Sequence, residues 1–256
     1  MLALVDFLGQ NSVILFLLLF ARLSGLLAFF PFFSHMKIPM SIKTALVIFL
    51  TIFLFPLASM PNIELSVMSL VLAILSEMML GFIAGTFLIL VFAMLEMAGM
   101  QISFVMGFTM ASVIDPQSNV SLPIISQILT FIALIVLLGF NGHHAMLTFI
   151  TQSLTQLPLG SFYPSHGVWK YLLKASTDMF IFGFILSFPI VGMSLLADVV
   201  FGMLMKTMPQ FNLLVVGFPI KIMVGFVVLI AVISGIMVIF QREFIRALEH
   251  LQLLMG

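Results

Sequence analysis

The chain has 256 residues, of which 63% are hydrophobic and only 7% are charged, and its mean hydropathy is +1.34. About a quarter of the residues in a soluble domain are charged, so this composition excludes a soluble globular protein and indicates an integral membrane protein. Nine basic residues balance nine acidic ones, so nothing in the composition suggests a nucleic-acid-binding surface. Cysteine is absent, which excludes disulfides, thiol catalysis and cysteine metal sites.

Phenylalanine and methionine are unusually common, with 29 Phe and 21 Met against one Trp and two Tyr. Trp and Tyr anchor helices at the membrane interface, whereas Phe and Met fill buried or adaptable contacts. Two interpretations stay open: much of the surface faces other proteins, or the usage reflects a compositional habit of the genome.

The first apolar run, Val13–Phe33, is expected to be an uncleaved helix, because no signal-peptide cleavage pattern follows it. Arg22 lies at its centre. An arginine at mid-membrane depth costs about 2.5–3.5 kcal/mol on insertion scales, so Arg22 should face protein or water, or snorkel from a helix that lies higher. Small residues form a face beside it: Ser24, Gly25 and Ala28.

The next two runs have awkward lengths. Ile42–Ala58 is short for a span, and Leu65–Met100 exceeds the roughly 20 residues of one straight span without reaching two spans and a loop. The remaining segments that we expect to be helical are Leu122–Phe140, the amphipathic Ala145–Leu157, Trp169–Phe201 with a kink at Pro189, and Ile222–Phe240 with a charged amphipathic tail to His250.

One face of Leu65–Met100 carries Glu77, Gly81 and Gly85 at positions i, i+4 and i+8. The two glycines form a GxxxG pattern, which permits close helix approach. Glu77, and Glu96 further along, are either functional carboxylates or structural ones bonded to a neighbouring subunit.

The segment Glu96–Pro116 combines apolar side chains with turn-forming residues. It is too apolar for a water-exposed linker and too interrupted for a span, so we expect it to need a protein partner. Its apolar residues include Phe104, Met106, Phe108 and Met110, and its turn formers include Gly107 and Asp115-Pro116.

The later polar residues give weaker signals. His143 and His144 suggest a turn that meets water or headgroups, since adjacent histidines form a poor metal pair. Lys170, Lys174 and Asp178 can pair along one helical face. Met203–Lys221 is expected to be a bent connection between two helices. Basic residues lie beside several of the about six apolar runs. If these runs were alternating spans, the basic residues could not all be cytoplasmic, so the positive-inside rule does not orient the chain. This favours charges that are buried in an assembly.

The chain resembles the FliR family of flagellar biosynthesis proteins, whose counterparts belong to virulence type III secretion systems. The resemblance runs along nearly the whole chain and is most specific in Pro209-Gln210-x-Asn212 and Gly217-Phe218-Pro219-x-Lys221. Other matching positions are Arg22, Pro31 and Pro39; Glu77 and Gly81; Glu96, Gly99 and Gln101; Gly107-Phe108 and Val113-Ile114-Asp115-Pro116; and Gly139 with His143.

The resemblance implies an all-α subunit of the export gate in the bacterial inner membrane, within the flagellar basal body. Such proteins are similar to a P-type subunit fused to a Q-type subunit, here residues 1–157 and 158–256. The implied partners are the P-type and Q-type gate subunits (FliP and FliQ), an FlhB-type switch protein, unfolded export substrates and membrane lipid. No cofactor, nucleic acid or enzymatic activity is implied.

The resemblance also implies a pore plug over residues 104–119. We expect Phe104, Met106, Gly107, Phe108 and Met110 to close the lumen, because apolar constrictions exclude ions by dewetting, and Asp115 and Pro116 to form the hinge of the loop. An ordinary re-entrant loop is the alternative. The buried polar or inter-subunit residues are expected to be Arg22, Glu77, Glu96, Asp178, Asp198, Lys206 and Lys221.

Two other function classes are compatible with parts of the sequence. A secondary transporter would use Glu77, Glu96, Asp178 and Asp198 as ion-coupling sites and Pro189 and Pro219 as helix breaks, but no inverted repeat is apparent. A membrane enzyme would rest on His143-His144 alone, without a nucleophile, metal triad or phosphate loop.

Overall fold

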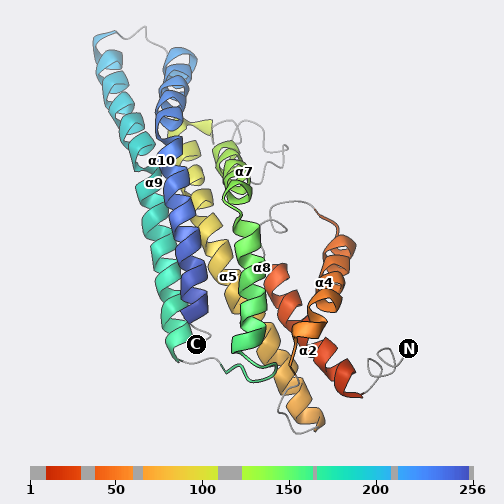
Figure 1. Ribbon diagram of the computed structural model, residues 1–256. Helices are drawn as coiled ribbons and strands as arrows, with labels where there is room; N and C mark the ends of the chain where they lie inside the picture. Colours follow the sequence, from red (N-terminus) through yellow and green to blue (C-terminus); the bar gives the residue numbers. More distant parts are fainter. Residues whose placement is uncertain are drawn as a thin grey trace. The chain divides into compact units, whose positions relative to one another are not determined.

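The computed structural model describes residues 10–29, 38–59, 66–108, 123–163, 166–208 and 213–253, and every regular element in these ranges is helical (Figure 1). The expected all-α membrane fold is confirmed. The elements are α2 (Gln10–Ala28), α4 (Met40–Leu54), the 3₁₀ turn η1 (Phe55–Leu57), α5 (Val67–Met106), α7 (Ile124–Gly139), α8 (Gly142–Gln156), α9 (His166–Thr207), the π-helical turn η2 (Leu213–Gly217) and α10 (Phe218–Leu253).

Four of the described segments are long and apolar enough to cross a membrane, and five if the consecutive helices α7 and α8 form one interrupted span. The four are Met40–Leu57, Val67–Met106, Gly167–Thr207 and Val215–Gln252. The apolar part of α2, Ser12–Ala28, is shorter than any of these segments. The second run, which looked short from sequence, reaches span length because η1 continues α4.

Helix α5 explains the awkward length of the third apolar run. It continues without a break for 40 residues (Figure 1), which at 1.5 Å per residue is about 60 Å, roughly twice the hydrocarbon thickness of a bilayer. The run is therefore one helix that is longer than a span, and not a pair of spans.

Two local predictions differ from the structure. His143 and His144 lie in the first turn of α8, because the break consists only of Phe140 and Asn141. Asn141 has a left-handed φ of 59°, and the chain bends by 66° between α7 and α8. The expected connection Met203–Lys221 is also shorter in the structure, because Lys206 lies in the last turn of α9 and Lys221 lies in the first turn of α10.

The contacts divide the chain into two compact units that do not follow chain order. Unit 1 contains Met1–Leu90, Asn141–Ala175 and Phe244–Gly256, and unit 2 contains Val91–Phe140 and Ser176–Glu243. Parts of α5, α9 and α10 belong to each unit. The P-like and Q-like parts are defined by sequence and stay a prediction.

Unit 1 is held together by close approach of α2 to α5. A Cβ atom added to Gly81 would lie 2.3 Å from the carbonyl oxygen of Arg22, and one added to Gly25 would lie 2.6 Å from that of Met78. Only residues without a side chain allow two helix backbones to meet at this separation. The end of α10 closes the unit, where the Gln252 side chain donates to that of Gln152 at 2.8 Å.

Unit 2 packs α7, α9 and α10 against the C-terminal part of α5. The Ser126 hydroxyl of α7 donates to the backbone carbonyl of Glu96 at 3.1 Å, and a Cβ on Gly99 would lie 2.4 Å from the Cα of Ser126. Phe92 of α5 packs edge-on against Phe240 of α10. Glycines and aromatic rings therefore set the helix spacing in this unit too.

Candidate functional site: a buried ion pair and an aromatic helix end

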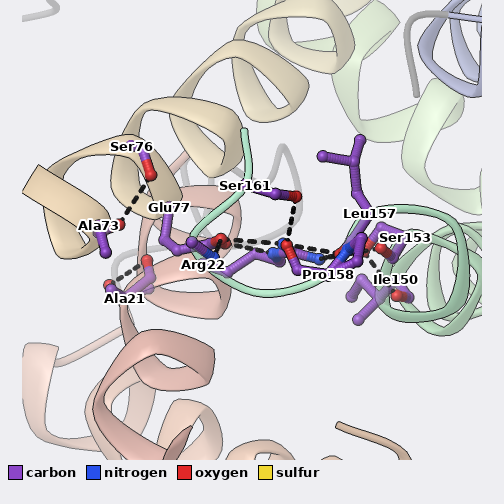
Figure 2. A network of polar contacts seen from close by, with 12 residues as sticks. Ala21, Arg22, Ala73, Ser76, Glu77, Ile150, Ser153, Leu157, Pro158 and Ser161 are labelled. Carbon is purple, nitrogen blue, oxygen red and sulfur yellow. Dashed lines mark hydrogen bonds and ion pairs between the residues drawn. The ribbon is translucent and has the colours of Figure 1, made fainter. Parts of the chain in front are cut away.

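The most enclosed charges in the described chain are Arg22 of α2 and Glu77 of α5, in unit 1. Arg22 is 2% exposed and Glu77 is fully buried. The Arg22 Nε donates to Glu77 Oε2, and Nη2 donates to Oε1 at 3.0 Å (Figure 2). Such a two-pronged arginine–carboxylate pair is stronger and more directional than a single ion-pair contact. Two charges that would each be costly in an apolar interior therefore neutralise one another.

The remaining guanidinium donors bind the C-terminal end of α8. Nη1 donates to the carbonyl oxygens of Ser153 at 2.9 Å and Leu157 at 3.3 Å, and Nη2 donates to Leu157 at 3.2 Å. The carbonyl of Leu157 lies beyond the last turn of α8, where carbonyls lack intrahelical partners, while that of Ser153 also accepts the N–H of Leu157 at 3.1 Å. A positive charge at this end also complements the helix dipole. The side chain of Arg22 therefore caps α8 from another helix, and every N–H of its guanidinium has an acceptor (Figure 2).

The carboxylate of Glu77 holds the turn that follows α8. Its Oε1 accepts the backbone N–H of Gly160 at 2.6 Å. Gly160 has a φ of 80°, a conformation that favours glycine. Arg22, Glu77, the end of α8 and the turn thus form one satisfied network within unit 1.

A second ion pair lies in unit 2. Lys221 Nζ of α10 lies 2.7 Å from both Asp198 oxygens of α9. The lysine side chain is only 10% exposed, but that of Asp198 is 51% exposed. This pair joins two helices as the Arg22 pair does, yet half of its carboxylate remains accessible.

The other predicted polar residues are less enclosed. Lys206 is exposed, Asp178 is half-buried, and half-buried Glu96 contributes its backbone carbonyl to the bond from Ser126. Among the described residues, no group of three or more His, Asp or Glu side chains could hold a metal ion. The rings of His143 and His144 lie 4.3 Å apart between centroids, without a third ligand.

The beginning of the predicted plug is an ordered helix end in unit 2. Helix α5 runs through Met106, so the first three residues of the predicted loop 104–119 are helical and not looped. Gly107 follows with a φ of 91°, and its N–H donates to the carbonyl of Phe104 at 3.1 Å. A Cβ at Gly107 would lie 2.9 Å from the Phe218 ring, so this glycine is required where the helix stops.

Side chains at this helix end point to different environments. Met106 is completely buried, and a Cβ on Gly225 of α10 would lie 2.7 Å from its methyl group. The Phe108 ring packs edge-on against Phe226. Phe104, in contrast, is 69% exposed. Met110, Asp115 and Pro116 lie outside the residues that the structure describes.

Sequence reasoning selected the two charged pairs but not their pairing. It singled out Arg22, Glu77, Asp198 and Lys221 one by one, because each is a charge in an apolar run. It did not identify Ser153, Leu157 or Gly160, which act through backbone groups. The only signal for them was the break after Leu157, where a helix with uncapped carbonyls had to end.

Long apolar helices with a charged pair neutralised between them are typical of an integral membrane protein. Residues 13–247 match the family described as bacterial export proteins, family 1, and the chain belongs to that family. The expected resemblance to FliR proteins is confirmed by individual relatives.

Three relatives show the range of similarity, all of them flagellar biosynthetic protein FliR. The one from Bacillus subtilis is 33% identical over 255 residues, covering 96% of this chain and 98% of its own length. The one from Escherichia coli is 28% identical and covers 80% of this chain and 78% of its own. The one from Aquifex aeolicus is 23% identical, with 92% of each chain covered.

Proposed function

We propose that this protein is a non-enzymatic subunit of the flagellar type III export gate in the bacterial inner membrane, where it helps to form and close the channel for unfolded export substrates. The observation that carries the proposal is family membership over residues 13–247, together with FliR relatives matched over nearly their full length. The proposed partners are P-type and Q-type gate subunits, an FlhB-type switch protein and membrane lipid.

The surfaces of both units support a role in an assembly. Large apolar side chains are exposed along most helices of both units; on α9 they include Phe180, Phe184, Phe188, Leu195 and Leu196. An apolar surface of this extent is stable only against lipid or other subunits.

Co-purification tests the proposal. The tagged chain, expressed from its own operon, is expected to copurify with the P-type and Q-type subunits, and its deletion should abolish flagella and export of flagellar substrates. A chain that purifies alone and moves ions in liposomes would support the transporter alternative. That alternative is less well supported, because two of its four coupling carboxylates, Glu77 and Asp198, are bound to Arg22 and Lys221.

We further propose that the segment after α5 contributes the plug of the gate. The exposed Phe104 and the residues following Phe108 are the candidates for the seal, while Met106 and Gly107 anchor the segment on α10 and end α5. An exposed aromatic ring at a helix end can dewet a narrow lumen.

A matched pair of substitutions tests the plug. Phe104→Ser removes a ring that is 69% exposed at the end of α5, and Phe131→Ser removes one that is 63% exposed on α7. In the assembled gate, Phe104→Ser is expected to raise ion conductance and Phe131→Ser is not. Equal conductance of both variants and the parent would contradict the assignment of Phe104 to the seal. Deleting Met106 as well would disturb the core of unit 2, so it is left in place.

A further inference from the structure

We propose that the Arg22–Glu77 pair is the joint that fixes the chain where the P-like part ends and the Q-like part begins. The proposal rests on the P-like and Q-like division given above, with its boundary at Leu157. Its contacts all lie within unit 1, between α2, α5, the end of α8 and the turn at Gly160.

The ion pair is not needed to bring α2 and α5 together. Gly25 and Gly81 already let the two backbones touch, since a Cβ on Gly81 would lie 3.0 Å from the carbonyl carbon of Gly25. Gly85 extends this contact, because its Cβ would lie 2.6 Å from the Cβ of Phe29. An apolar pair of similar volume in place of the charges would hold two such helices equally well or better.

The two charges add hydrogen bonds to the backbone at the junction between the P-like and Q-like parts. Arg22 donates to the carbonyl of Leu157, the last residue of the P-like part, and Glu77 accepts from the N–H of Gly160, the third residue of the Q-like part. An apolar pair could make neither bond. Leu157 and Gly160 are both half-buried, and a backbone group withdrawn from water without a partner is destabilising. The two charges supply the donor and the acceptor that these groups need where the junction packs against α2 and α5.

The roles of the two charges are not interchangeable. Glu77 needs only acceptor oxygens, for which a glutamine is a partial substitute, whereas Arg22 must supply several donors at fixed angles. A lysine has the charge but not the planar fork, so it cannot reach Glu77, Ser153 and Leu157 at once.

One apolar side chain of the turn also fixes the junction. The Leu159 side chain is 2% exposed, while Tyr163, at the end of the same turn, is 86% exposed. The Ser161 hydroxyl donates to the Pro158 carbonyl at 2.7 Å, a bond inside the turn itself. The position of the turn is therefore set by one apolar side chain and the two charges.

A spin label on the junction tests the proposal. The chain lacks cysteine, so Tyr163→Cys gives the full chain, purified in detergent, a single labelling site. Thr148→Cys, on an exposed face of α8, gives the matched control site. Tyr163 is 86% exposed, so a label there reports mainly the backbone motion of the turn and not side-chain contacts. With Arg22 and Glu77 intact, the backbone of the turn should be held in place, and the label is expected to have an immobilised component in its electron paramagnetic resonance spectrum.

Two variants separate a joint from an ordinary ion pair. Arg22→Lys should cause loss of much of the immobilised component at position 163 and none at position 148. The charge swap Arg22→Glu with Glu77→Arg keeps an ion pair but moves the donors to α5, and it should not restore the component. Two results would overturn the proposal: recovery of the immobilised component in the charge swap, or an unchanged spectrum at position 163 in Arg22→Lys.

Failure of this proposal can be told apart from failure of the export role. The label measurement uses the purified chain and requires neither partners nor export. A parent chain that failed to copurify with the gate subunits but kept the label immobilised would count against the export role and leave the joint intact.

Discussion

The Arg22–Glu77 pair of unit 1 and the Lys221–Asp198 pair of unit 2 are both ion pairs between two helices, but their surroundings differ. Each joins a basic residue of one helix to an acidic residue of another. Arg22 and Glu77 are both enclosed, and their donors and acceptors are used up by backbone groups. Asp198 is half exposed, and no backbone bond is recorded for its carboxylate in the described chain.

This difference indicates which pair is structural and which is adjustable. A fully satisfied buried pair cannot exchange partners without leaving a charge unpaired, so it acts as a fixed joint. A half-exposed carboxylate still has room for another donor from lipid, water or a neighbouring subunit. The same chemistry therefore supplies rigidity in unit 1 and an open contact in unit 2.

The largest expected effect is from breaking the enclosed pair. Arg22→Met should destabilise the purified chain by about 3–5 kcal/mol, because it leaves Glu77 buried without a counter-charge. The free energy of unfolding, measured by titration with denaturing detergent, checks this. The double variant Arg22→Met with Glu77→Leu should recover part of the loss. A double variant as unstable as Arg22→Met would show that the unpaired carboxylate is not the cause.

The second effect concerns the close approach that positions this pair. Gly81→Ala places a Cβ on rigid backbone at 2.3 Å from the carbonyl of Arg22, and it should cost about 1–3 kcal/mol through overpacking. The matched change in unit 2 is Gly225→Ala, where the nearest atoms all belong to the flexible Met106 side chain. Its effect on unfolding should be clearly smaller. Equal losses in the two variants would contradict the distinction between backbone and side-chain contact.

The third effect concerns the half-exposed Lys221–Asp198 pair. Asp198→Asn should change the stability of the purified chain by about 1 kcal/mol or less, because Asp198 is 51% exposed and the amide oxygen of an asparagine can still accept a hydrogen bond from Lys221 Nζ. If Asp198 serves a partner, the same variant should weaken copurification with the gate subunits by more than its effect on unfolding predicts. Asp178→Asn, on the same helix, is the control for a general effect of losing a carboxylate.

Sequence alone predicted the helical membrane class, the close-packing glycines and the charged residues, because hydropathy, spacing and charge are local properties of the chain. It could not predict that Arg22 and Glu77 meet, since their separation in space depends on how α2 crosses α5. The bonds to Leu157 and Gly160 were hidden for another reason. They use backbone groups, which every residue has, so no side chain marks them. The end of α5 inside the predicted plug was missed because Phe104, Val105 and Met106 suit a helix and an apolar loop equally well.

The smallest expected effect is the response of the two pairs to salt, and it is also the most direct comparison of their surroundings. Raising ionic strength from 0.1 to 1 M shortens the Debye length from about 10 Å to about 3 Å, which weakens exposed ion pairs and leaves enclosed ones nearly unchanged. The stability difference between the parent and Asp198→Asn should therefore shrink as salt is added, while that between the parent and Arg22→Met should stay constant. Glu77 is fully buried and Asp198 is not, so a shift of equal size in both would mean that water reaches Arg22 and Glu77 in solution.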